Sequence, residues 1–276
     1  MRGSHHPRAF NLIAMMTVAT LLAVGGLAVQ PQVAEAARQK VVIVVGPTGS
    51  MTSSLKRVAN GVAAKARDLG ANVVKIYSPY ATWAAVKSKA QGANLFVYLG
   101  HGNGWPSPYK PFQTRTKNGL GLNSAAGRGN YNHKYFGESY IRNNISLARN
   151  SVVLLMRTCY AAGNSEWGKS APSKATAKSR VDNYGAGFLR TGARVVISEI
   201  LGKAGYILNG LFKTNKTITE IFWSAPNAVK SYRIGPFGAT RSPSWARALM
   251  DPNPRIKGSY WRSVIGQLSL RAGDWR

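Results

Sequence analysis

Short apolar runs punctuate the first two hundred residues of the chain. Five of them, rich in Val, Ile and Leu, lie at 41–45, 72–77, 95–99, 151–156 and 193–198. Continuous β-branched and leucine-rich runs of this length are typical of strands that are buried on both faces of a sheet. The pattern therefore predicts five strands, most of them central in a sheet.

Helical spacing fills the intervals between these runs. From Leu55 to Leu69 apolar residues recur every three or four positions, until Gly70 ends the pattern. Shorter helices are predicted at 82–90, 141–148 and 181–189. Strands that alternate with helices predict an α/β fold with a mostly parallel sheet, flanked by helices on both faces.

Two segments do not follow this alternation. Residues 103–131 are rich in Gly, Asn and Pro and are expected to form a surface loop. Residues 214–276 are basic, aromatic and proline-bearing, and are interpreted as an irregular C-terminal extension of the α/β domain at 37–213. The pattern leaves open whether this extension is a small extra lobe or part of the same domain.

The first 36 residues have the composition of a signal peptide. Arg2 and Arg8 precede an uncharged stretch, and Ala34-Glu35-Ala36 provides the small residues that signal peptidase requires. We expect cleavage before Ala37 and a secreted or cell-envelope location. An uncleaved signal anchor is the alternative, because the apolar stretch is nearly long enough to span a bilayer.

Charge is the most unusual total. The chain carries 37 Lys and Arg against nine Asp and Glu, a formal net charge of +28. Such an excess favours a polyanionic partner, and for an exported protein an anionic envelope polymer or lipid surface is expected rather than a specific nucleic acid. The alternative is a solvated basic surface with no dedicated ligand. The sequence does not predict an oligomeric state.

Composition also excludes several kinds of site. Cys159 is the only cysteine, so internal disulfides and cysteine zinc sites are excluded. After residue 36 the chain has two histidines and eight scattered carboxylates, which makes a metal cage or a glycosidase pair unsupported. The turn at 46–50 lacks the lysine of a phosphate-binding loop, and no Gly-x-Ser-x-Gly motif is present. No cofactor and no metal are expected.

His101 and Cys159 remain as candidates for chemistry. Each follows a predicted buried strand, and in parallel sheets ligands bind beyond the carboxyl ends of the strands. On neighbouring strands, the imidazole and the thiol would be placed for nucleophilic catalysis, with the histidine stabilising the thiolate. The alternative is a buried structural cysteine. His133 has no strand-end placement and is expected to play no part.

The two strand ends resemble the caspase–hemoglobinase cysteine peptidases, a group that includes caspases, legumains, clostripain and gingipains. The resemblance covers roughly residues 41–201. Leu95-Phe96-Val97-Tyr98-Leu99-Gly100-His101-Gly102 is similar to the family's histidine segment, and Arg157-Thr158-Cys159-Tyr160-Ala161-Ala162-Gly163 to its cysteine segment. Arg157 stands where the family usually has an acid, which leaves specificity and activity open.

The resemblance implies a role for each matching residue. Cys159 would be the nucleophile and His101 the acid/base, with the backbone amides of Gly102 and Cys159 as the oxyanion hole. Family members cut after one chosen side chain, and a pocket for Arg or Lys would need an acid. Three acids lie near the same edge in sequence, namely Glu199, which is preferred, Asp182 and Glu166. A helix cap or an ion pair is the alternative role for each.

These expectations describe an exported cysteine endopeptidase acting on a peptide or protein substrate. One rival is a non-catalytic caspase-like module that holds anionic envelope material. The other is a cysteine amidase or acyltransferase that acts on envelope peptides with the same two residues.

Overall fold

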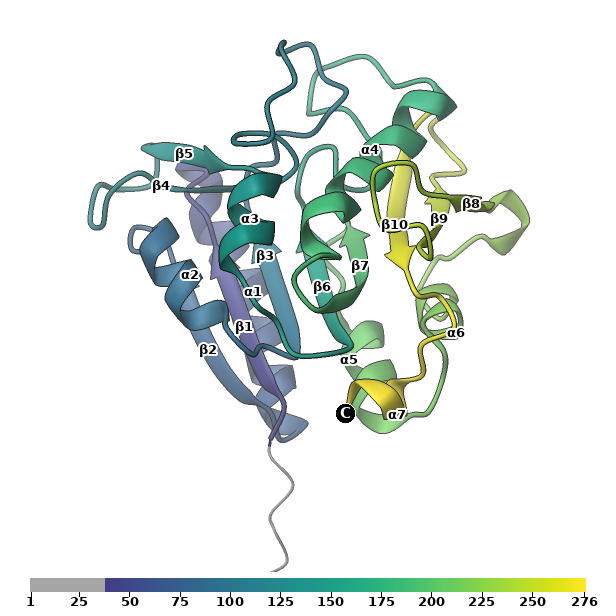
Figure 1. Ribbon diagram of the computed structural model, residues 1–276, viewed down its shortest axis with the longest axis horizontal. Coiled ribbons are helices and arrows are strands. Elements are labelled where there is room, and N and C mark those ends of the chain that lie inside the picture. The colour runs from purple at the N-terminus through teal and green to yellow at the C-terminus, as the bar shows by residue number, and fades with distance from the viewer. Residues whose placement is uncertain (1–37) are drawn as a thin grey trace, which may run out of the picture. The chain divides into compact units, whose positions relative to one another are not determined.

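A single eight-stranded sheet organises the protein, and the computed structural model describes it over residues 38–276 (Figure 1). The strand order is β2-β1-β3-β6-β7-β10-β9-β8. The first five of these strands pair in parallel, and the last three join antiparallel to the β7 edge. The strands are β1 (Lys40–Val45), β2 (Asn72–Tyr77), β3 (Leu95–Leu99), β6 (Ser151–Met156), β7 (Ala193–Glu199), β8 (Ile234–Gly238), β9 (Arg247–Pro252) and β10 (Tyr260–Gly266). The α/β class and the mostly parallel sheet are confirmed.

Helices cover both faces of the sheet. One hydrophobic core lies between the sheet and α1 (Thr52–Asp68), α5 (Gly205–Lys213), α6 (Ile218–Trp223) and α7 (Ala272–Trp275). The other lies between the sheet and α2 (Trp83–Ala90), α3 (Glu138–Asn144) and α4 (Lys174–Phe188). Successive residues of a strand point to opposite faces, so Val42 and Val44 enter one core while Val41 and Ile43 enter the other. This explains why these strands are apolar throughout.

Residues 214–276 are not an irregular extension. They contain β8, β9 and β10, and β10 continues the main sheet by pairing with β7. Short 3₁₀ turns at Gly49–Met51 and Lys230–Tyr232 complete the elements of the main body. Of the two arrangements left open by the pattern, the structure has the one in which this segment belongs to the same body as the five parallel strands.

The segment expected to be a long loop also contains regular structure. β4 (Leu120–Asn123) pairs antiparallel with β5 (His133–Phe136) in a separate two-stranded sheet. This hairpin lies beside the carboxyl end of β3, because the buried Tyr98 hydroxyl accepts a hydrogen bond from the Gly121 amide at 2.9 Å. It therefore borders the edge of the sheet where His101 stands.

Two helices differ from their predicted bounds. The helix predicted at 141–148 is α3, which ends at Asn144 because Ile145 is extended. The helix predicted at 181–189 is α4, which begins seven residues earlier, at Lys174, where the Ser173 hydroxyl caps it by accepting from the Thr176 amide. Propensity placed the buried half of α4 correctly and missed its exposed first turns.

The predicted signal peptide, or alternatively signal anchor, at residues 1–36 lies outside the described residues. Among residues 38–276, none of the helices is long and apolar enough to cross a membrane.

Candidate functional site

His101 and Cys159 stand beyond the carboxyl ends of adjacent strands. β3 and β6 pair in parallel, with Leu99 opposite Met156. His101 is two residues past the end of β3, and Cys159 is three residues past the end of β6. The expected neighbouring strands are therefore present, and the histidine and cysteine loops leave the sheet side by side.

The two loops are in close contact. A Cβ atom added to Gly102 would lie 2.1 Å from the Cys159 carbonyl oxygen, so only glycine fits there. The Tyr184 hydroxyl, from α4, donates a hydrogen bond to that same oxygen at 3.2 Å. The cysteine loop turns sharply, since Tyr160 adopts a positive φ of 68°. Gly102 and Tyr184 thus fix the backbone of Cys159 from two sides.

The Cys159 thiol is largely buried and faces backbone donors. Burial raises its pKa, and the nearby Glu166 carboxylate raises it further, while the amides of Trp167, Gly102 and Cys159 itself act in the opposite direction. The net effect is a pKa above the ordinary value. Burial and Glu166 thus outweigh the three amides and disfavour the thiolate that the sequence-based hypothesis assigns to Cys159.

His101 is held through its backbone and packs against a second histidine. The Tyr98 hydroxyl donates to the His101 carbonyl oxygen at 2.8 Å. The imidazole ring lies 4.8 Å from the ring of His133, centroid to centroid. Burial and the adjacent His133 lower the pKa of His101, against a smaller opposing effect of Glu166. His101 is therefore a neutral imidazole at neutral pH and is able to accept a proton.

His133, which is expected to play no part in the chemistry, nevertheless lies against His101. His133 begins β5, and that strand brings its ring onto His101. His133 is itself exposed, and its ring centroid lies 5.1 Å from that of Tyr135. The hairpin thus adds a second imidazole to the outer side of the site.

The preferred specificity acid, Glu199, does not reach the site. Its side chain is completely buried and forms an ion pair with Arg262 at 2.9 Å, and Arg262 also pairs with Asp251 at 2.8 Å. Glu199 additionally accepts hydrogen bonds from the Leu201 amide and the Tyr206 hydroxyl. A carboxylate with every oxygen engaged inside the core cannot meet a substrate, so the assignment of Glu199 to a substrate pocket is corrected to a core ion pair.

Asp182 also has an internal role. This α4 residue accepts hydrogen bonds from the amides of Thr240, Arg241 and Ser242 and from the Thr240 hydroxyl, at 2.7 to 2.9 Å. It fixes the 240–242 loop onto α4 and does not line the pocket beside Cys159. Its assignment to a substrate pocket is likewise corrected.

Glu166 is the one predicted acid that the structure brings to Cys159. Both line an open pocket of about 600 Å³, which we call the Cys159 pocket. The Tyr160 hydroxyl donates to Glu166 at 2.9 Å and orients it. The wall of the pocket is largely apolar, and Trp167, next to Glu166, is 99% exposed at its rim. Further lining residues are Arg157, Pro172, Ile200 and Trp261.

No family model and no curated protein matches the chain. The site is therefore interpreted from its own geometry. Within residues 38–276, no group of three or more His, Cys, Asp and Glu side chains is arranged to hold a metal ion.

A buried lysine beside the site was not anticipated from the sequence. Lys117 is 3% exposed, and its ammonium donates to the Asn103 and Ser107 side chains at 2.8 and 3.1 Å. It also lies 5.9 Å from the centroid of the Trp105 ring. Lys117 thereby ties the segment that follows His101 to the stretch that leads into β4. In sequence it is one of 37 basic residues, and nothing sets it apart.

Proposed function

We propose that this protein is an exported cysteine endopeptidase with a caspase-like fold, in which Cys159 is the nucleophile and His101 the general base. The observation that carries the proposal is the placement of both residues beyond adjacent parallel strands, with the thiol facing the amides of Gly102 and Cys159. A sheet with helices on both faces and a histidine-glycine pair after β3 supports the resemblance to the caspase–hemoglobinase group.

The reaction follows from these groups. His101 takes the thiol proton as the sulfur attacks the carbonyl carbon of the scissile peptide bond. Negative charge then develops on the carbonyl oxygen, where the amides of Gly102 and Cys159 stabilise it as donors. The C–N bond breaks, and the leaving amine receives the proton from His101. Water, deprotonated by His101, hydrolyses the thioester and restores the thiol.

The proposed resting state is a neutral thiol beside a neutral imidazole. The pKa of Cys159 is raised by burial and that of His101 is lowered by burial, so neither group is charged at neutral pH before substrate binds. Proton transfer then accompanies attack on the substrate. General-base catalysis works best when the pKa of the base lies near the working pH, which suits a histidine.

Glu166 supports a preference for a basic residue before the cleaved bond. It is the one carboxylate among the residues that line the Cys159 pocket, whose surface is largely apolar although Arg157 and Lys169 also line it. The methylene stem of Lys or Arg would pack on the apolar wall, and its charged end would meet Glu166. A peptide or protein with exposed basic residues is therefore the proposed substrate.

The proposal is tested with purified protein and a library of fluorogenic peptides. Cys159→Ala is expected to abolish cleavage, and His101→Ala to reduce kcat/KM by at least about a hundredfold, the lower range for loss of a general base. His133→Ala is the matched control, because it removes the neighbouring imidazole and leaves the dyad intact. Its effect is expected to remain below about tenfold. Cleavage that survives Cys159→Ala would refute the peptidase.

The raised pKa of Cys159 also favours a second candidate, the non-catalytic module. A buried, neutral thiol is the state expected of a structural cysteine. The two candidates separate on the folded native protein. If it cleaves no peptide in the library and its thiol alkylates at the same rate in the His101→Ala variant, the binding module is the function. The amidase or acyltransferase would instead release ammonia or transfer the acyl group to an added amine.

A further inference from the structure

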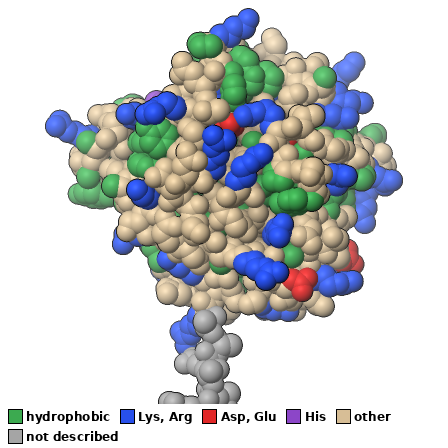
Figure 2. Space-filling model, viewed as in Figure 1, with side chains coloured by type: hydrophobic (Ala, Val, Ile, Leu, Met, Phe, Trp, Pro, Cys, Tyr) green, Lys and Arg blue, Asp and Glu red, His purple; other side chains and the backbone are tan. Residues whose placement is uncertain are grey.

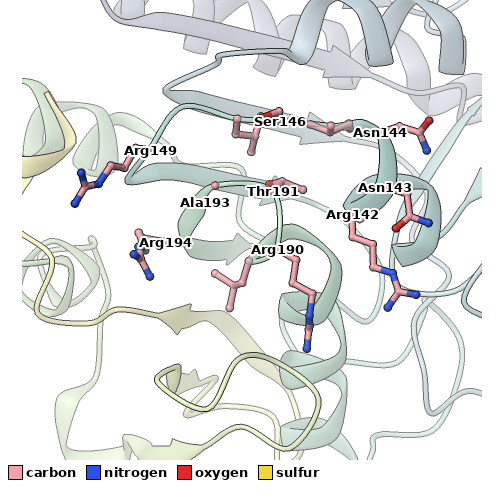
Figure 3. Close-up of a pocket in the computed structure, with 13 residues that line it drawn as sticks. Arg142, Asn143, Asn144, Ser146, Arg149, Arg190, Thr191, Ala193 and Arg194 are labelled. Atoms are coloured by element: carbon pink, nitrogen blue, oxygen red, sulfur yellow. The ribbon is translucent and has the colours of Figure 1, made fainter.

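A second pocket lies at the opposite edge of the sheet from Cys159. It has a volume of about 770 Å³ and is formed by α3, the α3–β6 connection, the turn after α4 and the start of β7 (Figure 3). Since β6 and β7 are parallel, this is the amino-terminal edge of the strands, whereas Cys159 is at the carboxyl edge. None of the residues proposed for catalysis lines it.

Four arginines line this pocket, which we call the arginine pocket: Arg142, Arg149, Arg190 and Arg194. In Figure 3 the side chains of Arg142 and Arg190 lie toward one end, and those of Arg149 and Arg194 toward the other. No Asp or Glu is among the lining residues. Four guanidinium groups without a carboxylate repel one another, and a bound anion would relieve that repulsion.

Two of the arginines are already held in place without losing their charge. The Arg190 guanidinium donates to the carbonyl oxygens of Ala186 and Arg241. That of Arg194 stacks 4.9 Å from the centroid of the Trp245 ring. The side chains of Arg142 and Arg149 are exposed and form no hydrogen bond or ion pair within the described part of the chain. The pocket thus combines fixed and available donors, which suits planar, bidentate binding of phosphate.

Three buried carboxylates are engaged away from the arginine pocket. Glu138, Glu199 and Asp251 form internal ion pairs with Arg241 and Arg262. The visible surface in Figure 2 accordingly carries many Lys and Arg side chains and few Asp and Glu. Among the described residues, no Asp or Glu lines the arginine pocket, so the arginines have no carboxylate partner within it.

The remaining lining narrows the class of ligand. No aromatic ring lines the pocket, so bases of a nucleic acid would have no surface on which to stack. Its apolar residues, Ile145, Leu147 and Leu189, are buried and do not project, so none can insert into the acyl region of a membrane. The lining therefore suits small anionic groups such as phosphate, which guanidinium groups bind in a bidentate geometry, in a space of about 770 Å³.

We propose that the arginine pocket binds phosphodiester groups of a linear polyol-phosphate polymer of the kind found in cell envelopes. The proposal is independent of peptidase activity, because the two sites share no residue. A net charge of +28 predicts a general attraction to polyanions, and the proposal assigns specific binding to one pocket of the molecule.

The test measures the Kd of a purified glycerol-phosphate polymer at about 0.15 M salt, where exposed charges more than about 8 Å apart are largely screened. The pocket variant is Arg142→Gln/Arg149→Gln, which removes the two available guanidinium groups. Each charge-assisted hydrogen bond is typically strong, so the Kd is expected to rise by at least about tenfold.

Lys87→Gln/Lys89→Gln is the matched control, because it removes the same charge from exposed positions on α2, outside the pocket. Its Kd is expected to change by less than about twofold, since charge without a pocket contributes weakly. Thermal melts and peptide cleavage by both variants check that the fold is intact. Equal losses in the two variants would overturn the proposal and leave only general charge attraction.

Two further probes distinguish the source of the phosphate. Phosphatidylglycerol vesicles and a single-stranded oligonucleotide are each titrated against the native protein and the pocket variant. We expect both to bind more weakly than the polymer and to lose little affinity in Arg142→Gln/Arg149→Gln. A tenfold loss for either probe, without one for the polymer, would overturn the assignment to a polyol-phosphate polymer.

Discussion

Around Cys159, neighbouring residues act on the thiol in opposite directions. Gly102 has no side chain to collide with the Cys159 carbonyl, so its backbone amide can approach the thiol and lower the thiol pKa. Glu166 brings a negative charge, which raises the thiol pKa and so disfavours the thiolate. The same carboxylate that suits the proposed basic substrate thus disfavours the thiolate of the proposed nucleophile in the free protein. A cationic side chain bound against Glu166 would reverse that effect, because it neutralises the charge that raises the thiol pKa.

This coupling gives a pH prediction. Glu166→Gln is expected to lower the pKa of Cys159, so that the alkylation rate rises at neutral pH and its midpoint moves to lower pH. The sign follows because the carboxylate disfavours a second negative charge nearby, and the amide does not. Alkylation with iodoacetamide, followed by mass spectrometry across pH 6 to pH 10, measures the profile.

Asp68→Asn, at the end of α1, is the control for this experiment. It removes an exposed carboxylate that is not among the groups shifting the thiol pKa, and the native profile is expected. An unchanged or higher midpoint in Glu166→Gln would show that Glu166 does not govern the thiol.

Some residues of the candidate site can be predicted from the sequence alone. His101 and Cys159 are the sole candidates left after exclusion, and each follows a recognisable strand. Glu199 could not be assigned correctly, since its partner Arg262 lies 63 positions further along and only the sheet brings them together. His133 could have been suspected from the alternation in His-Lys-Tyr-Phe, but its pairing with residues 120–123 depends on a hairpin within a glycine-rich stretch.

At the scale of elements, burial made strands easier to predict than helix ends. All five parallel strands lie within one residue of their predicted bounds, because residues buried on both faces must be apolar. The first turns of α4 are exposed and polar, so no apolar period marks them. Besides its packing on the core, α4 is held by a polar contact between Asp182 and the 240–242 loop.

That contact makes stability depend on pH. Burial alone would raise the pKa of Asp182, but hydrogen bonds from Arg241, Ser242 and Thr240 lower it overall. A carboxyl whose pKa is depressed on folding stabilises the native state above its unfolded pKa, and this contribution is lost as the pH falls below about 4. Asp182→Asn is therefore expected to lower the free energy of unfolding by about 2 kcal/mol at pH 7.

Urea unfolding of the native protein and of Asp182→Asn at pH 7 and pH 3 tests this linkage. The gap in free energy between the two is expected to narrow at pH 3, because the carboxyl of the unfolded chain is then largely protonated and its ionised form no longer favours the native state as strongly. If the difference in unfolding free energy is the same at pH 7 and pH 3, Asp182 stabilises the fold through its packing and not through its charge.

For the whole molecule, the last 63 residues complete the sheet. β10 covers the open edge of β7, and Trp275 is buried in the core behind the sheet, with its indole donating to the Asn94 carbonyl at 2.8 Å. Basic and aromatic composition concealed this, because β8 is half-exposed and the core contacts of Trp275 connect positions 181 apart. A chain that ends at Lys213 would leave β7 as an exposed apolar edge.

Such a truncation, covering residues 37–213, is expected to be insoluble or to lack cooperative unfolding, whereas residues 37–276 unfold in one transition. Expression yield, near-ultraviolet circular dichroism and thermal melts of the two chains measure the difference. If the chain of residues 37–213 is soluble and unfolds cooperatively, the five parallel strands form an independent domain instead.

The opposite placement of the two pockets along β6 and β7 also determines orientation. Six or seven residues of extended chain separate the two ends of these strands, a span of roughly 20 Å. A molecule bound to a wall polymer through the arginine pocket would therefore direct its Cys159 edge away from the polymer. Its proposed active site would then face proteins in the surrounding space and not the polymer chain to which the molecule is bound. This orientation suits cleavage of nearby proteins better than degradation of the wall.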